Sequence, residues 1–118
     1  MIGGSISGLF SAIFLRRFGW RVDVFERTET QQTGRGAGIV THPELIDLLR
    51  AAGLDANSDL GVEIADRKML DRAGRVIGEQ SRRQLVTSWD RVYRLLFDAL
   101  PAECYHTCLL YTSPSPRD

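Results

Sequence analysis

Hydrophobic side chains recur at the spacing of an α-helix in three stretches of the chain. The first stretch, residues 9–18, is a nearly continuous apolar run. The second places Leu45, Leu48 and Leu49 on one face. The third carries its apolar face at Val92, Leu95, Leu96, Ala99 and Leu100. Because such faces are buried against other elements in globular proteins, the pattern predicts three helices.

Residues typical of helix ends bound these stretches. Gly19 and Gly53 follow the first and second helix, where glycine suits the backbone conformation that ends a helix. Thr41 and Glu44 have the spacing of a capping box, in which each side chain bonds a backbone N–H group of the first turn. Ser88 can cap the third helix.

Strand patterns lie between the predicted helices. Residues 20–25 alternate apolar and polar side chains and predict a strand. Residues 67–70 and 75–78 predict the two arms of an antiparallel hairpin about a turn at residues 71–74. Residues 103–107 are expected to begin a further strand. Helices that alternate with strands predict an α/β fold.

A glycine-rich turn, Gly3-Gly4-Ser5-Ile6-Ser7-Gly8, leads directly into the first predicted helix. Dinucleotide-binding turns carry glycine at the first, third and sixth positions, and here Ser5 replaces the middle glycine. Gly3 suits the tight turn, and Gly8 would allow the helix to sit against a sheet. Because the start of a helix offers unpaired N–H groups and a positive dipole end, the turn predicts a pyrophosphate site.

Glu26 follows the predicted strand, about 20 residues after the glycines, at the spacing where an acidic side chain accepts hydrogen bonds from a ribose. For Glu26 alone, the alternative is a solvated carboxylate beside Arg27 and Glu29. Turn, helix, strand and Glu26 together favour dinucleotide binding.

Composition narrows the class of protein. The chain has 118 residues and a formal net charge of zero, so it is at most one domain and has no basic run for nucleic acid. No apolar run approaches the roughly 18 residues that a membrane span requires. Cys104 and Cys108 make no disulfide framework, and we expect a cytoplasmic protein.

Both ends of the chain are unusual. Only Met1 and Ile2 precede Gly3, although a dinucleotide fold has a parallel strand there, so we expect a fragment with a truncated first strand. The last eleven residues, Cys108–Asp118, resemble the translation of a transposase-type sequencing adapter. We therefore divide the chain into residues 1–107, the N-terminal part of a binding domain, and an adapter-derived or disordered tail, residues 108–118.

Three motifs give the chain a family resemblance: residues 3–9, residues 36–45 (Gly-Ala-Gly-Ile-Val-Thr-His-Pro-Glu-Leu) and residues 87–90. With them the chain resembles the N-terminal part of the FAD-dependent aromatic hydroxylases, the para-hydroxybenzoate hydroxylase class. Within that class it resembles most the branch that contains 2,6-dihydroxypyridine 3-monooxygenase. The resemblance implies a partial Rossmann-like FAD-binding domain, a βαβ unit with an added antiparallel hairpin.

The resemblance also implies a function. Such enzymes use FAD, with NAD(P)H as co-substrate and O2, to hydroxylate a small aromatic or N-heteroaromatic ring, and a homodimer of the longer protein is compatible with it. The implied cofactor-binding residues are Gly3, Ser5, Ile6, Ser7, Gly8, Glu26, Arg27, Gly36, Ala37 and Gly38. Among them, Glu26 would hold the adenosine ribose, Arg27 would lie beside the adenine, and residues 36–38 would run near the flavin. The chain allows no assignment of catalytic residues and suggests no metal ligand.

Two alternatives stay open at this point. One is another Rossmann oxidoreductase that binds FAD or NAD, although no pair of redox cysteines follows the second strand as in disulfide reductases. The other is a truncated chain that does not bind cofactor. In either case, we expect the isolated chain to be inactive and to bind FAD poorly or not at all, because the first strand supports the turn.

Overall fold

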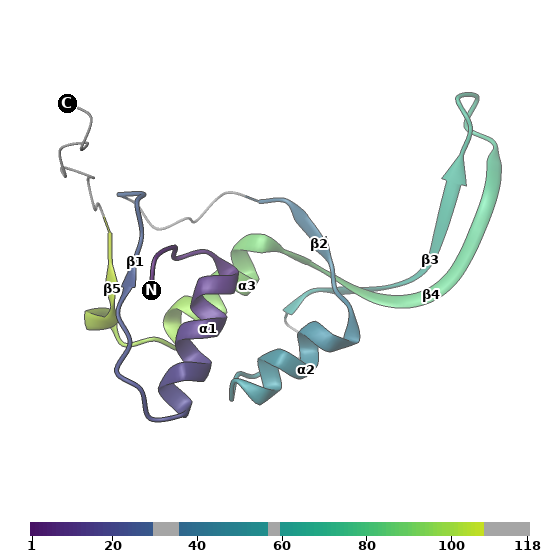
Figure 1. Cartoon of the computed structure of the whole chain (residues 1–118). Helices are drawn as coiled ribbons and strands as arrows, with labels where there is room; N and C mark the ends of the chain where they lie inside the picture. Colours follow the sequence, from purple (N-terminus) through teal and green to yellow (C-terminus); the bar gives the residue numbers. More distant parts are fainter. Residues whose placement is uncertain (30–35, 57–59, 108–118) are drawn as a thin grey trace, which may run out of the picture. The chain divides into compact units, whose positions relative to one another are not determined.

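In a computed structural model (Figure 1), the chain forms two compact units. The first unit joins Met1–Arg35 to Tyr93–Asp118, and the second is Gly36–Val92. Each unit has its own sheet, of two strands in the first and three in the second. The residues that the structure describes are 1–29, 36–56 and 60–107. The predicted tail, residues 108–118, lies outside them.

The sheet of the first unit is parallel. β1 (Val24–Phe25) pairs with β5 (Tyr105–His106), so the further strand expected near residues 103–107 is present. On the other edge of β1, the Phe25 N–H donates to the Met1 carbonyl at 2.9 Å, and the Phe25 carbonyl accepts from the Gly3 N–H at 2.8 Å. β1 therefore has a parallel neighbour on each side, as in a Rossmann-like βαβ unit, which confirms the predicted α/β class.

α1 (Ile6–Arg17) connects the turn to β1 and begins earlier than predicted. Its N-cap is Ser5, whose backbone is extended (φ −78°, ψ 179°). The helix ends before Gly19, which has a φ of 87° and donates its N–H to the Arg16 carbonyl. Its buried residues are Leu9, Ala12 and Ile13. The strand predicted over residues 20–25 is only two residues long.

α3 (Trp89–Asp98) begins in the second unit and ends in the first, and a short 3₁₀ helix, Ala102–Cys104, follows it. The predicted cap is present, since the Ser88 hydroxyl oxygen accepts the Arg91 N–H at 3.2 Å. The buried residues from α3 through the 3₁₀ helix are Val92, Tyr93, Leu96, Leu100 and Cys104. Of the predicted apolar face, Val92, Leu96 and Leu100 are buried, whereas Leu95 is half-buried and Ala99 is exposed.

The sheet of the second unit is antiparallel, with β4 (Val76–Ser88) between β2 (Gly38–Val40) and β3 (Val62–Leu70). The predicted hairpin is confirmed, and its arms are longer than the sequence pattern indicated (Figure 1). At its turn, the Asp71 carboxylate accepts the Ala73 N–H at 2.8 Å, and Gly74 has a φ of 80°.

α2 (Pro43–Ala51) follows β2 without the predicted capping box. The N-cap is His42, which makes no side-chain cap bond. The Thr41 N–H and hydroxyl instead both donate to the Leu85 carbonyl, at 2.8 and 2.7 Å, and so extend the pairing of β2 with β4. The capping prediction for Thr41 and Glu44 is wrong because the strand uses the threonine hydroxyl.

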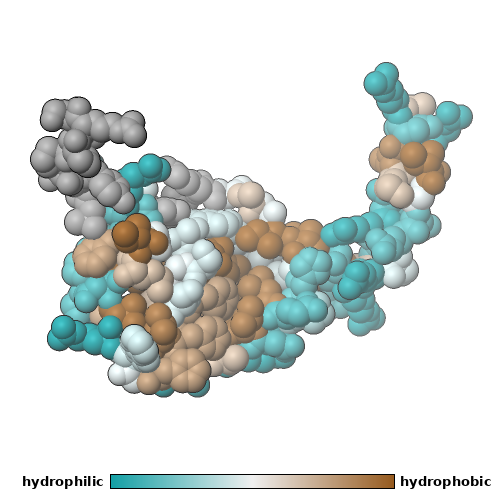
Figure 2. Space-filling view, viewed as in Figure 1, coloured by the Kyte–Doolittle hydropathy of each residue, from teal (hydrophilic) through white to brown (hydrophobic). Residues whose placement is uncertain are grey.

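The hairpin carries hydrophobic side chains that are exposed to solvent. Figure 2 shows hydrophobic residues on the surface near the hairpin's far end. The side chains concerned are at least half exposed and are those of Met69, Leu70, Val76 and Ile77.

Candidate functional site

The glycine-rich turn places backbone N–H groups at the start of α1. Gly3 has a φ of 101°, a conformation that residues with a side chain rarely adopt. The first bond of α1 runs from the Leu9 N–H to the Ser5 carbonyl, at 2.9 Å. The N–H groups between these residues therefore have no acceptor within the helix, and they coincide with its positive dipole end. This arrangement is suited to an anion such as a phosphate group.

Two further glycines allow the turn to be compact. A side chain at Gly8 would collide with the Gly3 carbonyl group, so Gly8 allows α1 to approach residues 1–3, which run beside β1. A side chain at Gly4 would overlap the hydroxyl and ring of Tyr105. The close packing of the turn thus depends on the absence of side chains at both positions.

Glu26 ties the end of β1 to this turn. The residue is buried, and one of its carboxylate oxygens, Oε2, accepts the Gly4 N–H at 2.7 Å. Its other oxygen, Oε1, accepts the Thr28 N–H and hydroxyl, each at 3.0 Å. The solvated carboxylate considered as an alternative is therefore wrong. Neither Gly4 nor Thr28 was among the predicted site residues.

Tyr105 holds the other side of Gly4. Its hydroxyl donates to the Gly4 carbonyl at 3.2 Å and lies 3.2 Å from the Tyr93 hydroxyl. Burial raises the pKa of Tyr105 above its usual value, and the bond to Tyr93 and the charge of Glu26 add to this shift. The phenol consequently stays protonated at neutral pH and remains a donor. The sequence pattern gave Tyr105 no role at the turn.

The remaining predicted cofactor residues are Arg27, next to Glu26, and residues 36–38. Arg27 follows Glu26 and is exposed. Residues 36–38 belong to the second unit and are also exposed. There, the Ala37 carbonyl accepts the Trp89 N–H at 3.0 Å. The structure thus brings Glu26 to the glycine-rich turn within the first unit. In the second unit, Gly38 is the first residue of β2, and residues 36–37 directly precede this strand.

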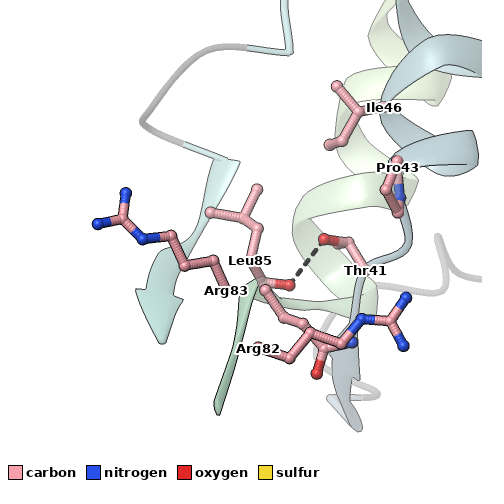
Figure 3. A pocket seen from close by; sticks show the side chains of 7 residues that line it. Thr41, Pro43, Ile46, Arg82, Arg83 and Leu85 are labelled. Atoms are coloured by element: carbon pink, nitrogen blue, oxygen red, sulfur yellow. Dashed lines mark hydrogen bonds between the residues drawn. The ribbon is translucent and has the colours of Figure 1, made fainter. Parts of the chain in front are cut away.

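The second unit has a hollow of about 180 Å³ beside α2 (Figure 3). Its lining residues are Thr41, Pro43, Ile46, Arg82, Arg83, Gln84 and Leu85. In Figure 3 the guanidinium groups of Arg82 and Arg83 lie on opposite sides of Leu85, as expected for neighbours along a strand. The two cations therefore do not converge on one anion.

Within residues 1–29, 36–56 and 60–107, no three His, Cys, Asp or Glu side chains are grouped so as to hold a metal ion. Over the same residues, no helix has the length and apolar character that crossing a membrane requires.

Residues 1–93 match the FAD binding domain family. The chain is 37% identical over 113 residues to 2,6-dihydroxypyridine 3-monooxygenase of Paenarthrobacter nicotinovorans. That alignment covers 93% of this chain and 28% of the relative, so the chain spans less than a third of the relative's length.

Solved structures share the fold. The 2,6-dihydroxypyridine-3-hydroxylase from Arthrobacter nicotinovorans matches with a TM-score of 0.81 and 37% identity, over 91% of this chain and 27% of that chain. HpxO of Klebsiella pneumoniae, complexed with FAD and uric acid, matches with a TM-score of 0.73 and 21% identity, over 91% of this chain and 29% of that chain. The resemblance to FAD-dependent aromatic hydroxylases is confirmed, and the chain belongs to the FAD binding domain family.

Proposed function

We propose that residues 1–107 are the N-terminal part of the FAD-binding domain of a monooxygenase, which hydroxylates an aromatic or N-heteroaromatic ring with NAD(P)H and O2. One observation carries this proposal. The glycine-rich turn lies at the positive end of α1 and is bonded to a buried acidic residue, Glu26, at the end of β1. This is the donor and acceptor set that an adenosine diphosphate group requires.

The residues of the turn fit FAD. N–H groups of residues 5–8 would bind the diphosphate, whose negative charges match the positive end of the helix dipole. Glu26 would accept hydrogen bonds from the adenosine ribose. From the family resemblance, Arg27 would lie beside the adenine, and residues 36–38 would run near the ribityl chain and the flavin ring.

Bound FAD would supply the electron transfer from NAD(P)H and the activation of O2. The residues of this chain would bind the adenosine end of the cofactor and fix its orientation. We assign the residues of the turn a binding role, because Glu26 and Tyr105 hold its backbone in place at the start of α1.

The relative's name supports a small heteroaromatic substrate, since that enzyme acts on a dihydroxypyridine. We extend the proposal to a substrate of this class. A cytoplasmic location is supported by Cys104, a free and buried cysteine, because free thiols are typical of reducing compartments. A homodimer of the whole protein stays a prediction that size-exclusion chromatography would test.

A hybrid protein tests the proposal. In it, residues 1–107 replace the matching segment of 2,6-dihydroxypyridine 3-monooxygenase. We expect the hybrid to purify with bound flavin and to oxidise NAD(P)H faster when a dihydroxypyridine is added. A folded hybrid that binds no flavin, while the unaltered relative does, would contradict the proposal.

A further inference from the structure

Side chains from two distant parts of the chain hold the backbone of Gly4. Glu26 accepts its N–H at 2.7 Å, and Tyr105 donates to its carbonyl at 3.2 Å. Because a peptide bond is planar and trans, a carbonyl and the N–H that follows it point in opposite directions. The bond from Tyr105 to the Gly4 carbonyl therefore directs the N–H of Ser5 away from Tyr105.

Tyr105 is itself held in place by other rings. The Tyr105 proton goes to the Gly4 carbonyl, which can only accept, so the fully buried Tyr93 donates to the Tyr105 oxygen. The ring of Phe97 meets that of Tyr105 edge-on, with centroids 4.9 Å apart, and stacks on Tyr93 at 5.8 Å. The position of the Tyr105 hydroxyl is thus fixed by the protein before any cofactor binds.

We infer that Tyr105 is a positioning residue for the FAD diphosphate, and that it acts through the peptide between Gly4 and Ser5. If this peptide rotated, a carbonyl oxygen would take the place of the Ser5 N–H, and a carbonyl oxygen repels a phosphate group. The hydroxyl of Tyr105 opposes this rotation. The inference rests on the proposed function, since it requires a diphosphate at the turn.

The variant Tyr105→Phe removes the hydroxyl and keeps the ring. ADP and adenosine, which differ only in the diphosphate, are titrated into the 118-residue chain and followed by ¹⁵N–¹H NMR. We expect the variant to bind ADP about threefold to tenfold more weakly, as for the loss of one neutral hydrogen bond, and adenosine equally well. The 3.2 Å distance is long for a hydroxyl donor, which favours the lower end of this range.

Tyr93→Phe is the matched control, because it removes the neighbouring hydroxyl and leaves the bond from Tyr105 to Gly4. We expect a smaller loss of ADP affinity in this variant. The ³¹P chemical shifts of bound ADP provide a second readout. They should change in Tyr105→Phe, since the diphosphate would then meet a differently oriented peptide.

Three results would overturn the inference. Equal weakening of ADP and adenosine would show a merely structural role, and unchanged ADP affinity would show no role. Both results leave the proposed function in place. If the wild-type chain binds neither FAD nor ADP, the inference is overturned, whereas the proposed function is decided separately by the hybrid protein.

Discussion

At the scale of single residues, the candidate site centres on Gly4, whose N–H and carbonyl both bond to side chains. The spacing of glycines and acid along the chain predicted the turn and Glu26, because both follow from local sequence. The contact between Tyr105 and Gly4 could not be predicted in this way. The two residues are 101 positions apart, and they meet only because β5 pairs with β1 in one register.

The packing of Gly4 leads to a first prediction. In Gly4→Ala, the added methyl group would overlap the ring and hydroxyl of Tyr105, so we expect the free energy of unfolding to fall by about 1–3 kcal/mol. Urea denaturation measures this loss. Gly36→Ala is the control, since a side chain there would come within 4 Å of no described atom. Equal stability of the two variants would show that the turn has room for a side chain.

At the scale of elements, the sequence predicted the helices and the hairpin but not every use of their residues. Thr41 has the sequence signature of a helix cap, yet its hydroxyl bonds the Leu85 carbonyl on β4. The sequence pattern placed Leu48 on one face with Leu45 and Leu49, yet 46% of the Leu48 surface is exposed while Leu49 is fully buried. In both cases tertiary partners decide what a locally favourable pattern leaves open.

The hairpin turn should depend on pH. Hydrogen bonds from Arg75, first from its backbone N–H and then from its side chain, lower the pKa of Asp71, and the Ala73 N–H adds to the shift. A carboxyl group with a lowered pKa stabilises the folded turn above its unfolded pKa, and this contribution is lost as pH falls through the folded value.

We therefore expect the NMR signals of residues 70–76 to shift toward unfolded positions below about pH 4, near the unfolded pKa of an aspartate. Asp71→Asn cannot titrate, so its turn signals should no longer follow pH in this range. A wild-type turn that keeps its signals unchanged down to pH 2 would contradict this account of Asp71.

At the scale of the whole molecule, the two units carry different shares of the predicted site. The first unit holds the turn, Glu26 and Tyr105, and its contacts do not require the second unit. The predicted residues 36–38 lie in the second unit. The sequence alone could identify the family through the three motifs at residues 3–9, 36–45 and 87–90. It could not show which residues would be bonded to one another, because that depends on strand pairing.

The central claim is that the first unit binds the adenosine diphosphate end of FAD. Titration of the ¹⁵N-labelled chain with FAD tests it most directly, because NMR maps weak binding residue by residue. We predict shifts centred on residues 3–8, and Glu26→Gln should weaken the affinity by about 1–3 kcal/mol, since a buried charged acceptor is lost. Glu29→Gln, an exposed neighbour, is the control and should leave the affinity unchanged. Saturable FAD binding without shifts at residues 3–8, or with the same affinity in Glu26→Gln, would contradict the claim.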